Sequence, residues 1–220
     1  MQQELTFVRS QDEKRLILKK VIAYIDGFNL YFGMKSKNWQ KYYWLDLYSM
    51  IQNMLRIDQE LISVKYFTSR VTDNPEKQQR QNDYLEALGN NPGIEIFFGK
   101  YQLNKRICTN CGFLNIIPNE KMTDVNIATE LLSDSFANLF DTALLISADS
   151  DLVGPVNRVL HLFPLKRVVI YFPPNRHSVD LSKIASRILH VSRDILIKNQ
   201  LPDVILKADG YKLTRPNRWK

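Results

Sequence analysis

The sequence is poor in the features that mark secreted or membrane-spanning proteins. Its 220 residues include only two cysteines, too few for the disulfide framework of a small secreted protein. No apolar run reaches the length of a membrane span, and the apolar patch at 16–18 is too short for a signal peptide. We therefore expect a soluble, cytoplasmic protein that does not enter a membrane.

Histidine and repetition are scarce as well. His161, His177 and His190 stand in no catalytic motif, and no serine-based arrangement is evident. The sequence contains no internal repeat and no low-complexity tract. We infer one domain with short appendages, whose chemistry depends on other side chains.

The charge of the chain favours a polyanionic partner. The net charge is +7 and the pI is about 9.3. A basic protein attracts polyanions, and nucleic acid is the commonest polyanion in a cell. Many cytosolic proteins are mildly basic without such a partner, so the charge alone leaves both interpretations open.

Strand-like apolar runs alternate with segments of helical spacing along most of the chain. This alternation predicts an α/β fold, with a mainly parallel sheet between two layers of helices. The predicted strands cover 21–25, 61–68, 94–98, 142–146, 167–171 and 187–191, and the predicted helices cover 46–56, 74–88, 123–139, 152–162 and 179–185.

The same pattern suggests how the chain is divided. Residues 1–19 are polar and are expected to form an N-terminal tail, and 20–192 form the folded domain. Within that domain, 100–118 are less regular and are expected to form a hairpin or an inserted arm. Residues 193–220 lose the pattern and end in a basic sequence, which indicates a C-terminal tail.

The segment 35–45 mixes cations with aromatic residues in the sequence KSKNWQKYYWL. Such a surface can stack on bases and hold phosphates. The alternative is a loop whose rings pack into the core, and the sequence leaves both interpretations open.

Acidic and amide side chains follow several of the predicted strands. Asp26 and Asn29 come after the first strand, Asp149 and Asp151 come after the fourth, and Asp124 begins a helix. In an open parallel sheet, sites form beyond the carboxyl ends of the strands. Oxygen ligands of this kind suit Mg²⁺ or Mn²⁺. Each residue could instead be a helix cap or turn residue, but their joint placement favours a shared metal site.

Three blocks of the sequence resemble a known family. They are YIDGFNLY at 24–31, EKMTDVNIATELL at 120–132 and DTALLISADSDLVGPV at 141–156. In wording and order they resemble the signature blocks of the NYN domain of the PIN-like nuclease superfamily, in the bacterial branch once grouped as a domain of unknown function. The resemblance implies a three-layer α/β/α sandwich of PIN type, an acidic pocket for Mg²⁺ or Mn²⁺, and hydrolysis of RNA.

The resemblance also implies roles for particular residues. The matching catalytic positions are Asp26, Asn29, Asp124, Asp149 and Asp151, and the four aspartates among them are the expected metal ligands. Ser147 is expected to support these ligands by hydrogen bonds, and Lys121 to hold a phosphate. Ala148 stands where glycine is commoner in the family.

The function expected from these residues is a metal-dependent endoribonuclease acting on single-stranded RNA. One alternative is an RNA-binding or regulatory protein that keeps the fold without catalysis. Another is a phosphoesterase of small molecules, because the same metal chemistry acts on small phosphate esters.

The two cysteines form the motif CTNCG. Cys108 and Cys111 supply half of the ligands of a structural zinc site. A second copy of the motif from another subunit would complete the four ligands, in a homodimer. The alternatives are a redox disulfide and two inert thiols.

Overall fold

The computed structural model describes residues 18–72, 74–207 and 209–220, without the side chains of 102–106 and 115–120. The part of the expected N-terminal tail at 1–17 therefore lies outside the described residues. None of the described helices is long and apolar enough to cross a membrane.

A six-stranded sheet forms the centre of the molecule, and all of its strand pairs are parallel. The strands lie in the order β3-β2-β1-β6-β7-β8, so the chain moves outwards from β1 in both directions. Their bounds are β1 Lys19–Asp26, β2 Gln59–Thr68, β3 Ile94–Phe98, β6 Thr142–Ile146, β7 Arg167–Phe172 and β8 Arg187–His190.

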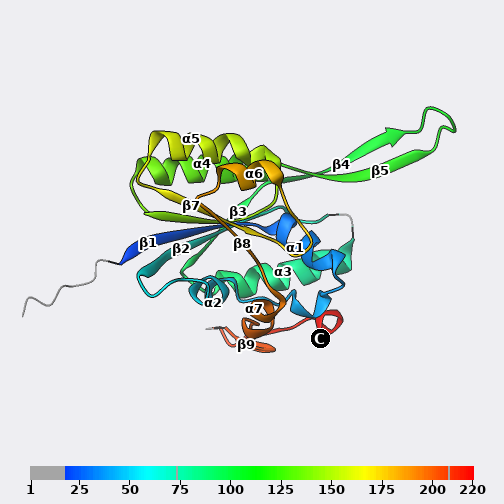
Figure 1. The fold of residues 1–220 in the computed structure, drawn as a ribbon. Coiled ribbons are helices and arrows are strands. Elements are labelled where there is room, and N and C mark those ends of the chain that lie inside the picture. Colours follow the sequence, from blue (N-terminus) through cyan, green and yellow to red (C-terminus); the bar gives the residue numbers. More distant parts are fainter. Residues whose placement is uncertain (1–17, 73, 208) are drawn as a thin grey trace, which may run out of the picture.

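Helices cover both faces of this sheet (Figure 1). One layer contains α1 (Gly27–Ser36), α2 (Leu47–Gln52), α3 (Pro75–Gly89) and α7 (Arg193–Lys198). The opposite layer contains α4 (Thr123–Phe136), α5 (Val153–Leu162) and α6 (Val179–Ile184). The three-layer α/β/α sandwich of PIN type with a parallel central sheet is confirmed.

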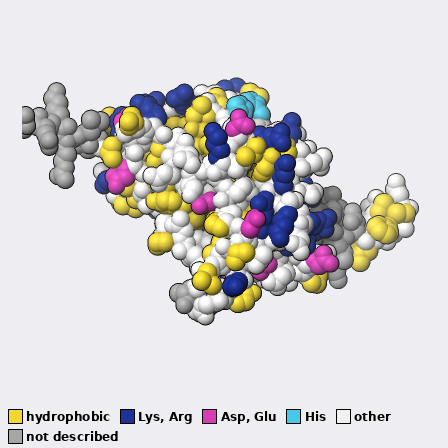
Figure 2. Space-filling model, turned by 90° about the horizontal axis from the view of Figure 1, so that it is seen from below, with side chains coloured by type: hydrophobic (Ala, Val, Ile, Leu, Met, Phe, Trp, Pro, Cys, Tyr) yellow, Lys and Arg dark blue, Asp and Glu magenta, His cyan; other side chains and the backbone are white. Residues whose placement is uncertain are grey.

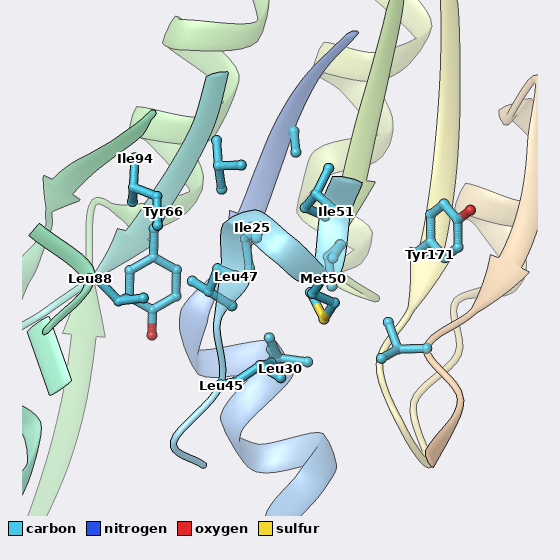
Figure 3. Packing of buried hydrophobic residues seen from close by; sticks show 14 of the residues in the cluster. Ile25, Leu30, Leu45, Leu47, Met50, Ile51, Tyr66, Leu88, Ile94 and Tyr171 are labelled. Carbon is cyan, nitrogen blue, oxygen red and sulfur yellow. The ribbon is translucent and has the colours of Figure 1, made fainter. Parts of the chain in front are cut away.

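The two faces of the sheet have separate hydrophobic cores, and β1 contributes to both. Side chains alternate in direction along a strand. Val21, Ala23 and Ile25 therefore join the core beneath α1, α2 and α3, while Ile22 and Tyr24 join the core beneath α4 and α5. Figure 3 shows part of the first core. An uninterrupted apolar run such as Val21–Ile25 is what a strand covered on both faces requires.

The segment between β3 and α4 forms an antiparallel hairpin that projects from the sandwich (Figure 1). Its strands are β4 (Lys100–Ile107) and β5 (Leu114–Lys121). From the sequence, a hairpin or an inserted arm is expected over 100–118. The tip carries exposed apolar side chains, including Ile107 and Phe113.

The C-terminal segment differs from the basic tail that the sequence suggests. After α7 it forms a two-stranded sheet of β9 (Val204–Leu206) and β10 (Lys212–Thr214), and then a short 3₁₀ helix, η3 (Asn217–Trp219). Trp219 packs against Trp44 and Tyr84 with ring centroids 6.3 and 6.1 Å away, and Leu213 is buried beside Trp44. Apolar burial therefore holds this segment against the domain despite its basic ending.

Candidate functional site

The candidate site lies at the carboxyl ends of β1 and β6, where the direction of the strand order reverses. A crevice forms at such a switch point because the connections from the two strands leave on opposite faces of the sheet. The register of β1 and β6 ends with Ile25 beside Ile146. Asp26 is the last residue of β1 and Ser147 directly follows β6, so the register brings these two positions together.

Asp26 is held in place by three hydrogen bonds. Its Oδ1 accepts the backbone N–H of Asn29 at 2.9 Å, which caps the N-terminus of α1. Its Oδ2 accepts the side-chain amide of Asn29 at 2.9 Å and the hydroxyl of Ser147 at 2.9 Å. The carboxylate is thereby fixed by β1, α1 and the loop after β6.

The electrostatic environment of Asp26 is unusual for a carboxylate. Asp26 is 3% exposed, and this burial raises the pKa of its carboxyl above the usual range. Hydrogen bonds from Asn29 and Ser147 act in the opposite direction and lower this pKa, whereas the nearby charge of Asp149 raises it. A bound cation would relieve both the burial cost and the repulsion between the two carboxylates.

The loop after β6 presents Asp149 and Asp151. The backbone N–H of Asp149 donates to Ser147 Oγ at 3.0 Å, so Ser147 links Asp149 to Asp26. Asp149 Oδ1 accepts the backbone N–H of Asp151 at 3.0 Å and caps the 3₁₀ helix η2 (Ser150–Leu152). Asp151 itself is exposed. Asp26 and Asp149 are thus helix caps and neighbours in one site at the same time.

Lys121 and Asp124 lie where the hairpin ends and α4 begins. Asp124 is half-buried in the first turn of α4, where the free N–H groups favour a negative charge. Helix α4 packs against β1, which carries Asp26, and against η2, which Asp149 caps. Lys121 is exposed at the end of β5, opposite Lys100. The roles of Asp124 as a ligand and of Lys121 as a phosphate contact stay predictions.

The donor atoms fit a hard divalent cation in kind. Asp26, Asp149 and Asn29 offer only oxygen atoms to a ligand at this point. Among the described residues, no group of three or more His, Cys, Asp or Glu side chains is placed to hold a metal ion. Mg²⁺ usually binds proteins through one or two carboxylates, and keeps several waters or substrate phosphates as its other ligands. A pair of carboxylates at a crevice meets that requirement, whereas a site made only of protein ligands would need more.

Arg176 belongs to the site although the sequence reasoning above did not select it. Its Nη1 donates to Asn29 Oδ1 at 3.4 Å, and its guanidinium lies 6.0 Å from the centroid of the Phe32 ring. With Ser36, Ala148 and Asn175 it lines an open hollow beside the acidic residues. The available signal was its position in FPPNRH, directly after the strand 167–171. Arg176 is missed when only acidic residues are sought at the ends of the predicted strands, because it is a cation.

An aromatic cavity of about 280 Å³ lies beside α1. Gly27, the residue after Asp26, lines it, so the cavity and the acidic residues share the first turn of α1. Aromatic rings from α1, α3, β2, β4, η3 and the segment 40–43 form much of its wall; they are Phe28, Tyr31, Phe32, Tyr43, Tyr66, Tyr84, Tyr101 and Trp219.

Cys108 and Cys111 lie at the tip of the hairpin, away from the elements of the acidic site. Both are exposed free thiols. Hydrogen bonds from the backbone of Asn110 and Cys111 lower the pKa of the Cys108 thiol, and the Cys111 side chain lowers it further. The described residues supply no third His, Cys, Asp or Glu ligand beside them. Zinc binding at this motif stays a prediction.

The fold and the site together define a class of protein. A parallel α/β/α sandwich with acidic residues at its switch point is the arrangement of PIN-like nucleases. The model of the NYN domain matches residues 20–192, and the chain therefore belongs to the NYN domain family of the PIN-like superfamily. This membership places it with nuclease-type hydrolases at the level of the family.

Two further similarities are more distant. The chain is 28% identical over 239 aligned positions to 6-hydroxy-3-succinoylpyridine 3-monooxygenase of Pseudomonas putida (strain DSM 28022 / S16), covering 89% of this chain and 74% of that protein. A protein of unknown function from Vibrio parahaemolyticus RIMD 2210633 has a similar structure, with a TM-score of 0.54 at 18% identity. The match covers 84% of this chain and 98% of that one, and it supports the fold alone.

Proposed function

We propose that this protein is a metal-dependent endoribonuclease that hydrolyses phosphodiester bonds of RNA. The observation that carries the proposal is the buried carboxylate of Asp26, fixed by Asn29 and Ser147 beside the charge of Asp149. Burying one carboxylate close to another is costly unless a cation compensates the charges. Family membership supports the same conclusion.

Asp26 and Asp149 would hold Mg²⁺ or Mn²⁺, with Asp151 and Asp124 as the further candidate ligands. When bound, the ion lowers the pKa of a water ligand and stabilises negative charge on phosphate oxygens. Asn29 holds the Asp26 carboxylate in one orientation through its side-chain amide. Ser147 couples Asp26 to the backbone of Asp149, so the two acidic positions keep a fixed relationship.

The substrate phosphate would be bound by cations around the crevice. Arg176 already contacts Asn29 and presents a planar guanidinium, which can donate two parallel hydrogen bonds to a phosphate. Lys121 would add a point charge from the hairpin side. Single-stranded RNA in the cytoplasm is the proposed substrate, because exposed bases can stack on the aromatic residues near α1.

Zinc-linked pairing of two subunits through Cys108 and Cys111 is part of the same proposal.

The decisive experiment compares the wild type with Asp149→Asn on labelled single-stranded RNA and DNA in the presence of Mn²⁺. Metal stabilisation of developing charge is worth several kcal/mol, so we expect the variant to lose activity by about 100-fold or more. Asp141→Asn is the matched control, because Asp141 accepts a backbone hydrogen bond from Lys20 at the start of β6, at the opposite end of the strand from Asp149.

Two results would contradict the proposal. One is cleavage by Asp149→Asn at the wild-type rate, and the other is no cleavage of either nucleic acid by the wild type with any divalent metal. Thermal unfolding of all three proteins shows whether a loss of activity reflects the site or the fold.

A second candidate function is the conversion of a small aromatic substrate. The relative from Pseudomonas putida is by name a monooxygenase of a substituted pyridine. The aromatic cavity favours this alternative, because its walls suit a flat ring. Incubation with 6-hydroxy-3-succinoylpyridine, dioxygen and a reductant, followed by mass spectrometry, tests it. If the substrate is unchanged, this second function is ruled out and the nuclease proposal is the one that stands.

A further inference from the structure

The aromatic cavity beside α1 has walls suited to a planar ring. Tyr31 and Tyr43 are neighbours within it, with ring centroids 4.9 Å apart. The ring centroids of Tyr43 and Trp219 are 5.7 Å apart. Aromatic side chains in such arrangements bind flat rings by stacking or edge contacts. The volume of about 280 Å³ lies just below the range for small-molecule sites, which is about 300–1,000 Å³. The cavity therefore suits a ligand of one ring system with a short substituent.

The lining of the cavity is also electrically one-sided. Among the described residues that line it, Lys35, Lys77, Arg80 and Arg218 are cationic and none is acidic. Arg80 has an acidic neighbour in Glu76, at 3.5 Å along the exposed side of α3. Lys35 lies 5.5 Å from the centroid of the Phe32 ring, so its charge sits beside an aromatic wall. A ligand with a negative charge complements this lining. Figure 2 shows groups of Lys and Arg side chains on one face of the molecule, both near the hairpin and towards the opposite edge.

Tyr43 supplies a polar group that the described residues leave without a partner. Its side chain is 7% exposed, and its buried hydroxyl makes no hydrogen bond with them. Burial raises the pKa of Tyr43, and the hydroxyl therefore remains a proton donor across the physiological range. An unsatisfied buried hydroxyl is energetically unfavourable, and a ligand that accepts its hydrogen bond would relieve this penalty.

The cavity is coupled to the acidic site through Gly27 and Tyr66. A Cβ atom on Gly27 would lie 2.7 Å from the Tyr66 hydroxyl oxygen and 2.7 Å from the carbonyl oxygen of Phe67. Only glycine therefore allows the ring of Tyr66 to lie against the first turn of α1. Burial raises the pKa of Tyr66, and the negative charge of Asp26 raises it further. A ligand in the cavity would thus lie beside the first turn of α1, the helix that Asp26 caps.

We propose that this cavity binds a planar aromatic ring that carries an anionic group. Resting on the proposed nuclease function, the ligand is one nucleotide of the RNA next to the scissile phosphate. Its base lies among Tyr31, Tyr43 and Trp219, and its phosphate faces Lys35. The same ring-and-anion chemistry also occurs in a free aromatic acid, and the experiment separates these two sources.

Isothermal titration of the full-length protein with matched probes tests the proposal. UMP and AMP provide a ring and an anion, uridine provides the ring alone, and ribose 5-phosphate provides the anion alone. Nicotinate provides a ring and an anion without a nucleotide. A charge-assisted hydrogen bond contributes about 1.5–3 kcal/mol, so we expect a nucleotide to bind about tenfold or more tightly than uridine or ribose 5-phosphate.

Two variants and one control locate the binding. Tyr43→Phe removes a hydroxyl that has no partner among the described residues, so it should leave the thermal stability unchanged or higher and still weaken UMP binding about threefold to tenfold. Lys35→Gln should weaken UMP binding about tenfold and leave uridine binding unchanged. Lys198→Gln is the control, because Lys198 is exposed at the end of α7 and does not line the cavity.

Each outcome decides the proposal. Tight nucleotide binding that both cavity variants weaken supports it. Binding of nicotinate without binding of UMP or AMP keeps the ring-and-anion chemistry and overturns the nucleotide assignment. No binding of any ring-bearing anion, or equal binding by wild type and both variants, overturns the whole proposal. RNA cleavage without UMP binding would leave the proposed function standing, and UMP binding by Asp149→Asn without cleavage shows that the cavity acts separately from the acidic site.

Discussion

A buried ion network fastens α4 to the sheet, and its removal should destabilise the domain strongly. Lys65 Nζ on β2 lies 2.7 Å from Asp134 Oδ2 and 2.7 Å from Glu130 Oε2, both on α4. The hydroxyl of Tyr24 on β1 donates to Asp134 Oδ2 at 2.6 Å. The side chains of Lys65 and Asp134 are only 7% and 5% exposed. We predict that Lys65→Met leaves the Asp134 carboxylate buried without its cation.

The size of the loss follows from this burial. Removing one partner of a buried ion pair costs about 3–5 kcal/mol, because the remaining charge stays desolvated. For a domain of this length, each kcal/mol lowers the melting temperature by about 2–4 °C, so the expected decrease is about 6–20 °C. Burial lowers the pKa of Lys65, but hydrogen bonds with Asp134 and Glu130 more than offset this and leave it raised. The contribution of Lys65 is therefore fully present at neutral pH and is lost only as pH rises through its raised pKa.

Urea unfolding at pH 7, followed by circular dichroism, measures the change in free energy of unfolding. Lys183→Met is the control, because Lys183 and Asp180 form an ion pair of 2.9 Å with side chains 68% and 63% exposed. Exposed pairs contribute about 0–1 kcal/mol. Adding Asp134→Asn to Lys65→Met should recover part of the loss, since it removes the uncompensated charge and keeps an acceptor for Tyr24. A loss for Lys65→Met no larger than that of the control would refute the reasoning.

Four further predictions concern the site and its surroundings. Because the pKa of Asp26 is raised, the rate of RNA cleavage should begin to fall, as pH decreases, at a pH above the usual pKa range of an aspartate; a pH–rate profile measures this. The same raised pKa means that the free energy of unfolding rises as pH falls from this pKa towards about 3.9. Asp26→Asn should remove this dependence of stability on pH. Gly27→Ala should cost about 1–3 kcal/mol in urea unfolding, because its Cβ would approach Tyr66 at 2.7 Å; an unchanged stability would contradict the close packing. Trp219→Ala should cost about 2 kcal/mol, less than a fully buried tryptophan, and a melting curve identical to wild type would mean that the C-terminal segment does not stabilise the domain. Cys108 should be alkylated by iodoacetamide faster than Cys111, judged by peptide mass spectrometry, because its thiol pKa is lowered.

The sequence predicts those parts of the molecule that depend on local patterns. The run Val21–Ile25 predicts a strand buried on both faces, and β1 is such a strand. The position of Asp26 directly after that run predicts a side chain at the carboxyl edge of the sheet. Ser147 follows the strand 142–146, and the resemblance to the NYN family implies that it supports the acidic residues by hydrogen bonds. In the structure its hydroxyl donates to Asp26.

Other parts depend on contacts that no local pattern encodes. Trp219 belongs to a sequence with a basic ending, and only the distant rings of Trp44 and Tyr84 make it part of the fold. Tyr43 lies in a segment with two open interpretations, and the structure shows that its ring is buried while it also lines a cavity. Arg176 reaches Asn29 across 147 positions of chain, a distance at which residue type gives no information about pairing.

The hydrogen bond between Ser147 and Asp26 joins residues 121 positions apart in the chain. Contacts of such separation form late in folding, because a long loop must close first. A growing chain on the ribosome therefore carries Asp26 long before Ser147 and Asp149 have been synthesised. For a protein proposed to cleave RNA, the complete site therefore forms only after residue 149 has been synthesised.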